Sequence, residues 1–234
     1  MERYMITVRG VAFAYTRGHE VLAGVDLDLE PGLTLLVGPN GCGKSTLLKI
    51  AAGVEKPARG RVTVGGADLW RDEVASRSHI AYLPEHPDLT PYATVFEILQ
   101  LVCGLRGRSI DEAQLALEWV GLGALGERTV RELSKGQRRR ATLAAARIGT
   151  PDCLLLDEPI EGMDRAFRDV LVAWIGDRVA DGATAVIVSH EFDLFAPLAR
   201  CAVTVRDGSC HTVESLPPGP ERFAILERLA RGDD

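Results

Sequence analysis

The chain has 234 residues, a length that fits one domain or one domain with an insertion. Hydrophobic residues make up 46% of it and charged residues 26%, a balance that supports a packed core and excludes a disordered, collagen-like or low-complexity chain. Because 27 lysines and arginines stand against 33 aspartates and glutamates, the formal net charge is −6, and we expect no nucleic acid as a partner.

The first part of the chain predicts antiparallel strands, followed by a strand that runs into glycines. Alternating apolar positions, broken by turn residues, predict three antiparallel strands: Met5–Val8, Val11–Tyr15 and Val21–Leu29. The apolar run Leu33–Val37 predicts a further strand. A helix is expected to follow from Lys44 to about Ala52 and to end at Gly53.

The middle of the chain changes from strand patterns to helix patterns. Arg61–Val64 and His79–Leu83 predict two more strands. Residues 85–132 predict a helical insertion, in which Thr94 caps one helix and Ser109 or Asp111 caps the next.

Beyond residue 132, strands and helices alternate, which predicts an α/β fold with a largely parallel sheet. The expected elements are the helix Ser134–Ile148, the strand Cys153–Leu156, the helix Arg165–Val179 and the strands Ala183–Val188, Cys201–Val205 and Cys210–Val213. Asp207-Gly208 predicts a hairpin between the last two strands. A short terminal helix, Arg222–Leu229, is expected after a proline-rich break.

Two further features predict a soluble chain in a reducing compartment. The five cysteines are odd in number and scattered, which favours free thiols over a disulfide framework. The longest apolar stretch, Ala93–Leu105, is too short for a membrane span and contains Glu97, and the N-terminus lacks the apolar region of a signal peptide.

Residues 38–45 fit the pattern G-x-x-x-x-G-K-[ST], which arises by chance in roughly one chain of this length in a hundred. With the residue that follows, this phosphate loop consists of Gly38, Pro39, Asn40, Gly41, Cys42, Gly43, Lys44, Ser45 and Thr46. Its backbone N–H groups and the helix dipole can bind a polyphosphate. Lys44 supplies a charge to the β- and γ-phosphates and Ser45 a hydroxyl for Mg²⁺. The alternative is a glycine-rich turn with an exposed lysine.

Two acidic residues, Asp157 and Glu158, come directly after the apolar run Cys153–Leu156. Ligand groups of α/β sheets collect at the carboxyl ends of strands, and adjacent side chains of an extended chain point in opposite directions. We therefore expect Asp157 to bind Mg²⁺ and Glu158 to act as the base that orients or deprotonates an attacking water. The alternative is a solvated acidic loop.

With these motifs in place, residues 2–213 resemble the ATP-binding subunit of an ABC transporter. The phosphate loop corresponds to Walker A of that family, LLLDEP to Walker B, and Leu133-Ser134-Lys135-Gly136-Gln137 to the signature LSGGQ. The resemblance implies ATP and Mg²⁺ as cofactors. It also implies a P-loop NTPase core with a mostly parallel sheet, an N-terminal antiparallel β subdomain and an inserted α-helical subdomain. The core and β part are expected at 1–84 and 133–214, the insertion at 85–132 and a C-terminal tail at 215–234.

The signature allows two interpretations. Ser134-x-x-Gln137 is a capping box, so stabilising a helix start is one possible role. In the family that the chain resembles, the signature binds the γ-phosphate held by the opposite subunit, which implies that Ser134, Gly136 and Gln137 bind ATP across a dimer. Lys135 replaces the usual glycine. Several cations crowd the helix start and favour an anion-binding end: Lys135, Arg138, Arg139 and Arg140.

Three further positions match elements of the family. The resemblance implies that Tyr15 stacks on adenine, the alternative being a core tyrosine. Ile160–Asp164 resembles the D-loop. His190 is similar to the switch histidine that contacts the γ-phosphate, so that Lys44, Glu158 and His190 form the implied catalytic set.

Glu85 departs from the family pattern, which usually has a glutamine that touches the Mg²⁺ site and relays the nucleotide state to the membrane subunit. A glutamate can still ligate Mg²⁺, although it adds a negative charge beside the γ-phosphate. The segment Leu83-Pro84-Glu85, followed by Thr94-Val-Phe-Glu97, resembles the ATPases of ABC-2-type exporters, which favours export.

The resemblance as a whole implies an ATP-hydrolysing subunit that pairs with a second ATPase subunit, identical or related, and drives an integral membrane permease from the cytoplasmic face of the cell membrane. One alternative is a soluble ABC-type ATPase that acts on a non-membrane partner. Another is a regulator that binds nucleotide but hydrolyses little of it.

Overall fold

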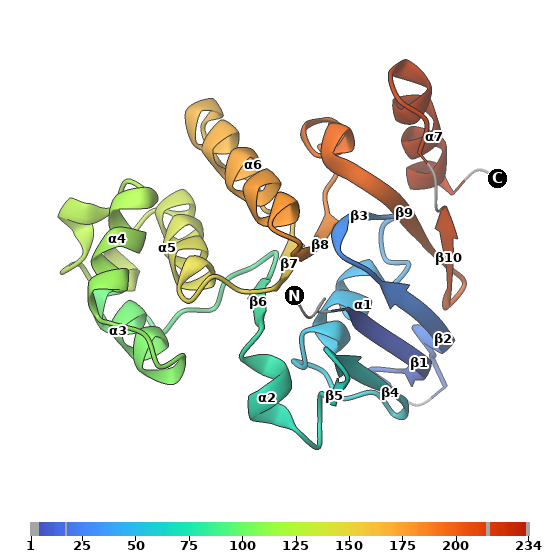
Figure 1. The fold of residues 1–234 in the computed structure, drawn as a ribbon, viewed down its shortest axis with the longest axis horizontal. Helices are drawn as coiled ribbons and strands as arrows, with labels where there is room; N and C mark the ends of the chain where they lie inside the picture. The colour runs from blue at the N-terminus through green and yellow to red at the C-terminus, as the bar shows by residue number, and fades with distance from the viewer. Residues whose placement is uncertain (1–4, 17, 214–215, 233–234) are drawn as a thin grey trace.

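The computed structural model describes residues 5–16, 18–213 and 216–232, and within these residues the strands form two sheets (Figure 1). The larger sheet has the strand order β10-β9-β3-β8-β7-β6 and the smaller β2-β1-β4-β5. The larger sheet is parallel except at β10, which runs antiparallel to β9. This topology confirms the predicted α/β class, with a mostly parallel sheet and an antiparallel N-terminal part.

The strand bounds agree with the apolar runs of the sequence to within a few residues. The larger sheet consists of β3 (Gly32–Val37), β6 (Ile80–Leu83), β7 (Cys153–Asp157), β8 (Thr184–Val188), β9 (Ala199–Arg206) and β10 (Ser209–Val213). The smaller sheet consists of β1 (Ile6–Phe13), β2 (Leu22–Leu29), β4 (Arg59–Val64) and β5 (Ala67–Asp68).

The prediction of two separate strands on either side of Gly10 is wrong. The described residues 6–13 form the single strand β1, which pairs with β2 on one side and β4 on the other. The register with β2 shifts between Val8 and Val11, and Gly10 has a φ of 58°. Glycine therefore introduces a bulge that bends the strand without ending it.

The larger sheet has a hydrophobic core on each face. Leu33, Leu35 and Val37 of β3 belong to one core together with α3 to α7, while Leu36 belongs to the other, with α1 and the smaller sheet. Leu155 of β7 faces the α1 side in the same way. Because strands buried on both faces need no polar positions, these runs lack the alternation seen in β2.

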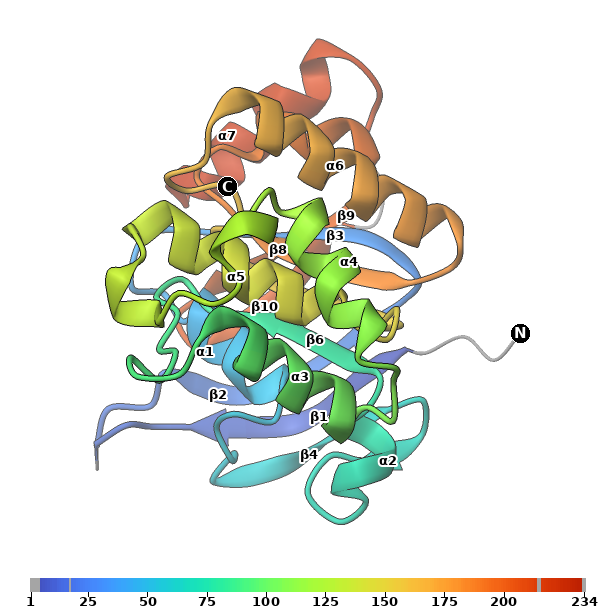
Figure 2. The same cartoon turned by 90° about the vertical axis from the view of Figure 1, so that its left-hand side faces the viewer.

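Helices surround this sheet, and three of them form a group on one side of it (Figures 1 and 2). The group on the left of Figure 1 faces the viewer in Figure 2 and consists of α3 (Val95–Leu105), α4 (Asp111–Trp119) and α5 (Lys135–Arg147), with the short turns Gly123–Leu125 and Val130–Glu132 between the last two. The others are α1 (Lys44–Ala51), α2 (Glu73–Arg77), α6 (Arg165–Ala180), α7 (Pro220–Arg231) and two single turns at 192–194 and 196–198.

Helix starts show where local sequence rules are sufficient. The predicted cap of α3 is confirmed, because Thr94 Oγ1 accepts from the N–H of Glu97 over 3.1 Å and the Glu97 carboxylate accepts from the N–H of Thr94 over 2.7 Å. The predicted caps of α4 are wrong. Ile110 occupies the N-cap position, although Ser109 Oγ does accept a weak bond of 3.3 Å from the N–H of Asp111.

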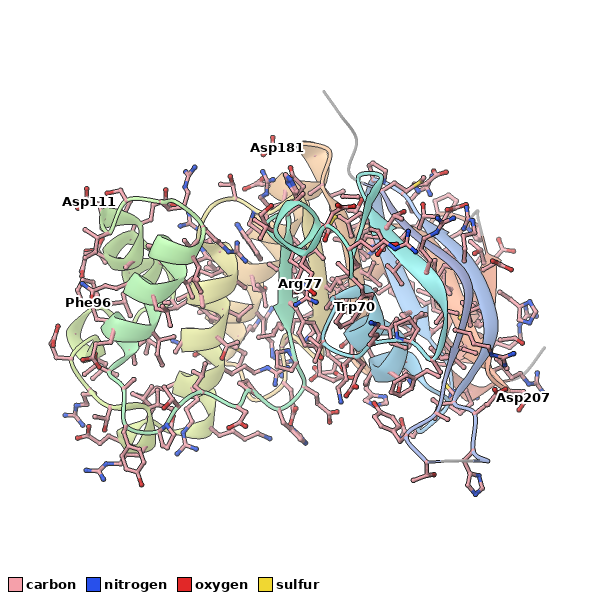
Figure 3. All side chains as sticks on the ribbon, turned by 90° about the horizontal axis from the view of Figure 1, so that it is seen from below. Trp70, Arg77, Phe96, Asp111, Asp181 and Asp207 are labelled. Atoms are coloured by element: carbon pink, nitrogen blue, oxygen red, sulfur yellow. The ribbon has the colours of Figure 1, made fainter. Side chains whose placement is uncertain are left out.

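The short helix α2 was not expected from the sequence. It follows Trp70, whose ring lies under the guanidinium carbon of Arg77 at 4.7 Å (Figure 3). A five-residue helix has too little periodicity to be recognised, and here its position depends on that tertiary contact. The predicted hairpin at Asp207-Gly208 is confirmed by the pairing of Arg206 with Ser209. Among the described residues, we find no helix with the length and apolar character that a membrane span requires.

Candidate functional site

The phosphate loop connects the end of β3 to α1, and its glycines adopt backbone conformations that other residues rarely take. Gly38 and Gly43 have φ values of 140° and 110°. A Cβ atom on Gly38 would lie 2.8 Å from the carbonyl oxygen of Val205, and one on Gly43 would lie 3.0 Å from Cγ1 of Val21. Glycine is required at both positions because the loop passes directly against neighbouring segments.

Lys44 reaches back across this loop from the first position of α1. Its Nζ donates to the carbonyl oxygens of Gly38 over 2.8 Å and Pro39 over 2.9 Å. An ammonium group has three donors, so one donor remains for a bound phosphate. The lysine is therefore part of the cavity wall rather than a free cation on an exposed turn.

Asp157 ends β7 beside Ser45, and its carboxylate fits a divalent cation. Only 2% of the residue is exposed. Burial raises the pKa of Asp157, while a hydrogen bond with Ser45 opposes that rise. Its Oδ1 has no hydrogen-bond partner among the described residues, which is costly for a buried charge. A hydroxyl and a carboxylate oxygen are the ligands that Mg²⁺ takes in phosphate-binding loops, so Ser45 and Asp157 fit this ion.

The carboxylate of Glu158 is held in place by a backbone N–H group. Glu158 has a φ of 48°, and its carboxylate accepts from the backbone N–H of His190 over 3.0 Å and 3.2 Å. Burial raises the pKa of Glu158, and the hydrogen bond from His190 opposes the rise. A carboxylate with a raised pKa and a fixed orientation has the properties of a general base.

A cavity of about 530 Å³ brings most of the predicted residues together. It is lined by Tyr15, Val21, Asn40, Gly41, Gly43, Lys44, Ser45, Thr46, Glu85, Asp157, Glu158, Val188 and His190. Gly38 instead lines a neighbouring cavity of about 220 Å³, which shares Lys44 and His190 with the first. Val21 and Val188 were not predicted as site residues, because an apolar residue of a cavity wall cannot be told from a core residue in the sequence.

Cys42 belongs to the predicted phosphate loop, but its side chain does not line the nucleotide cavity. Its side chain packs on the hydrophobic core shared with α1, and its Sγ would lie 3.0 Å from a Cβ atom on Gly38. Only its backbone belongs to the loop, where its N–H donates to Pro39 over 3.4 Å. The sulfur turns inward, where the missing side chain of Gly38 leaves room for it.

The sequence profile of the ABC transporter family matches residues 22–161, which is more than half of the chain. The chain belongs to the ABC transporter family. A protein of Pyrococcus furiosus that carries the name of an ABC transporter ATP-binding protein is 34% identical over 212 residues, covering 87% of this chain and 81% of that protein. A protein of Xanthomonas axonopodis pv. citri named for aliphatic sulfonate import is 35% identical over 227 residues, covering 96% of this chain and 76% of that protein.

The fold of this ABC ATPase also agrees with solved cassettes. A dimeric ATP-binding cassette in a post-hydrolysis state, bound to ADP and phosphate, has a TM-score of 0.81 at 22% identity, covering 92% of this chain and 100% of that chain. At this identity the similarity shows the fold alone. Together with the family match, the loop and acid geometry identify the chain as an ATP-binding and ATP-hydrolysing protein.

Tyr15 follows β1 at the rim of the ABC ATPase cavity, and the alternative of a core tyrosine does not hold because 55% of the residue is exposed. Its hydroxyl lies 3.3 Å from Oγ1 of Thr46. The edge of Phe13 supports the ring at a centroid distance of 4.8 Å. The ring is thus fixed beside the phosphate loop with part of its surface open to a ligand.

Glu85 also lines the ABC ATPase cavity, and 49% of its side chain is exposed. Its negative charge contributes to the raised pKa of Asp157, after burial. Glu85 and Asp157 thus line the same cavity. No other carboxylate of the described cavity lining is so exposed, since Asp157 and Glu158 are 2% and 9% exposed as residues.

The ABC signature residues do not line this cavity in the described part of the chain. They form the capping box that the sequence predicts: Ser134 Oγ accepts from the N–H of Gln137 over 3.2 Å, and Gln137 Oε1 accepts from the N–H of Ser134 over 2.9 Å. Gly136 approaches the D-loop, since a Cβ atom there would lie 3.2 Å from the carbonyl oxygen of Gly162.

The cations expected at the start of α5 are present, and two of them are paired with acidic residues. Lys135 Nζ donates to the carboxylate of Glu161 over 2.8 Å, and Arg140 pairs with the carboxylate of Asp164. Arg139 is buried. Acidic residues of the D-loop thus offset the cations, so the anion-binding capacity of this end depends on Ser134, Gly136 and the helix dipole.

Arg139 stands in the sequence among the cations at the start of α5, and the contacts that it makes were not predicted. It is 2% exposed and bonds to the backbone of Glu85, Asp157 and Glu158. Helical spacing provided a signal: Arg139, Leu143 and Ala146 lie at i, i+4 and i+7, and all three are buried.

Proposed function

We propose that this chain is the ATP-driven subunit of a membrane transporter, in which two ATPase subunits close on bound ATP and open after hydrolysis. The observation that carries the proposal is that Ser134 and Gly136 lie outside the cavity lined by Lys44 and Glu158. The signature, placed on an exposed helix start, is then available to the nucleotide of a second subunit, identical or related. One chain supplies half of each of two sites.

Within one subunit, each cavity residue has a separate role in binding or hydrolysing ATP. The glycines of the phosphate loop and Lys44 bind the polyphosphate, and Tyr15 stacks on the adenine. Ser45 and Asp157, with Glu85 nearby, would hold Mg²⁺, which when bound neutralises charge on the β- and γ-phosphates. Glu158 orients the attacking water and accepts its proton. His190, whose side chain is 64% exposed on the cavity wall, contacts the γ-phosphate.

A second surface, separate from the cavity, favours binding of a membrane partner. Tyr92, Leu101 and Leu105 lie on or just before α3 and are 76%, 63% and 78% exposed. Exposed apolar side chains grouped on one element are typical of contact surfaces. We place the cytoplasmic face of an integral membrane permease on this part of the molecule, so that movement of α3 during closure acts on the permease. The chain is thus peripheral on the cytoplasmic side of the cell membrane.

Co-purification from detergent-solubilised membranes tests this function. Leu105→Asp should abolish capture of an integral membrane protein while leaving ATP binding by the isolated chain unchanged. Val74→Asp is the matched control, because Val74 is 86% exposed on α2, a different element. Capture of no membrane protein by the unmodified chain would favour a soluble ABC-type ATPase instead.

The proposed direction of transport is export. It rests on the segment Leu83-Pro84-Glu85, whereas the relative named for aliphatic sulfonate import points the other way. Mass spectrometry of cells with and without this chain distinguishes the two directions. Loss of an exporter causes its solute to accumulate inside the cell, and loss of an importer depletes it.

A further inference from the structure

Arg139 carries a buried guanidinium that connects three segments of the chain. It lies in the second turn of α5, and it is 2% exposed. Its Nη1 donates to the carbonyl oxygen of Glu85 over 2.5 Å, and its Nη2 donates to the carbonyl oxygens of Asp157, over 2.7 Å, and Glu158. The signature helix, the end of β7 and the segment after β6 therefore meet at one side chain.

The partners of Arg139 are main-chain atoms, so the bonds fix backbone position rather than a side-chain charge. Burial is the largest influence on its pKa, which it lowers against the opposing effect of Glu161 and other nearby carboxylates. The carboxylate of Glu161 lies 3.9 Å away. A buried cation is retained at this place against a desolvation cost, which points to a role beyond filling space.

A second arginine, which is only partly buried, shows what a purely structural connection looks like. Arg106, at the end of α3, donates to the carbonyl oxygens of Ile148 over 2.5 Å and Ile80 over 3.0 Å. Ile80 begins β6, so these bonds lie at the end of the strand opposite to the cavity. Both arginines donate to main-chain carbonyl oxygens, and only Arg139 contacts the strand ends where the acids lie.

The backbone of Glu158 explains why such a contact matters. Its φ of 48° is uncommon for a residue with a side chain. Its N–H donates to the carbonyl oxygen of Val188 over 2.8 Å, and its carbonyl oxygen accepts from Arg139. Both backbone polar groups of Glu158 are therefore bonded, which fixes the main chain from which its carboxylate reaches the N–H of His190.

We propose that Arg139 is a positioning residue for Glu158. Through Arg139, the orientation of the signature helix α5 determines how the Glu158 carboxylate is directed toward the attacking water. This inference rests on the proposed role of Glu158 as the base. Arg139 is not among the described residues that line the nucleotide cavity, so it acts through Glu158. The rate of ATP hydrolysis therefore depends on the position of α5, and so on whether a second subunit has bound its nucleotide to the signature.

A series with decreasing hydrogen-bond capacity tests the proposal in the full-length chain: Arg139→Lys, Arg139→Gln and Arg139→Met. Since misplacement of a catalytic group by about 1 Å can cost about a hundredfold in rate, we expect kcat to fall at least about tenfold in Arg139→Met and less in the other two. ATP affinity should stay within about twofold of the parent. Arg106→Met, the matched control, should lower the melting temperature and keep kcat.

A double-mutant cycle with Glu158→Gln separates positioning from other effects. In the Glu158→Gln background, single-turnover hydrolysis should respond little to Arg139→Met, because the carboxylate that Arg139 aims is already gone. An equal fold-loss in both backgrounds, or an unchanged kcat in Arg139→Met, would overturn the proposal. Should Arg139→Met fail to fold, Arg139→Gln carries the same cycle. Normal turnover in Glu158→Gln alone would instead refute the proposed base, which is a distinguishable result.

Discussion

The backbone N–H of His190 donates to both carboxylate oxygens of Glu158, over 3.0 Å and 3.2 Å. The imidazole is farther away, with Nε2 at 3.6 Å from Oε1. The orientation of the acid therefore depends on the main chain at position 190 rather than on the histidine ring. The ring remains available for a ligand in the cavity.

The first prediction concerns the base itself. Glu158→Gln should bind ATP with nearly normal affinity and hydrolyse it at least about tenfold more slowly, because the amide cannot accept the proton of the attacking water. Equilibrium binding of a fluorescent ATP analogue and phosphate release together provide the measurement. Normal turnover in this variant would remove Glu158 from the catalytic role.

The second prediction is a pH dependence. Burial raises the pKa of Glu158, and a base works only when deprotonated, so kcat should rise with pH through that raised pKa. The acid limb should lie above the ordinary glutamate value of about 4.3. Measurement of kcat at saturating MgATP across the pH range tests this. An acid limb at the ordinary value, or the same limb in the residual activity of Glu158→Gln, would contradict the assignment.

The third prediction concerns stability at Asp157. Burial raises the pKa of Asp157, so the native state binds this proton more tightly than the unfolded state. The stability contributed by that proton is present at low pH and lost as pH rises through the raised pKa. Asp157→Asn, which stays neutral, should therefore raise the melting temperature of the nucleotide-free protein at neutral pH by about 2–4 °C for each kcal/mol.

Calorimetry at two pH values checks that prediction for Asp157→Asn. The gain in melting temperature should shrink toward acid pH, where the parent carboxyl is protonated as well. The same variant should lose the additional stabilisation that Mg²⁺ gives to the ATP complex. An equal gain at both pH values would show that the amide acts through new hydrogen bonds instead of charge.

The fourth prediction separates the two roles of Ser134. Ser134→Ala removes a helix cap, which costs about 1 kcal/mol, and it should also reduce hydrolysis and ATP-driven dimerisation while leaving ATP binding to the monomer intact. Thr94→Ala removes the same kind of cap from α3 and is the matched control. Light scattering with ATP and the Glu158→Gln background reports dimerisation. Equal effects of the two variants on hydrolysis and dimerisation would show that Ser134 acts only as a helix cap.

The sequence was sufficient wherever a short stretch of chain determines its own structure. The phosphate loop, the acid pair after β7 and the capping boxes at Thr94 and Ser134 follow from local rules, because backbone φ values, strand ends and N-caps involve residues within a few positions. The structure contains each of them where it was expected, with Lys44, Asp157 and Glu158 on one cavity.

Features that depend on distant segments were not predictable in the same way. The pairing of Lys135 with Glu161 joins residues 26 positions apart, and Arg139 meets the carbonyl of Glu85 across 54 positions. A run of four cations looks like a solvated face until its partners are known. The inward turn of Cys42 likewise depends on space that only the folded loop defines.

The left-handed backbone at Glu158 has a consequence for protein engineering. A glycine adopts that conformation without strain, and a neutral residue at position 157 avoids burying a charge. Directed evolution for thermal stability alone should therefore select both changes. The resulting variants would be more stable and would no longer hydrolyse ATP. A screen for a more durable version of this protein therefore has to select on nucleotide turnover in every round.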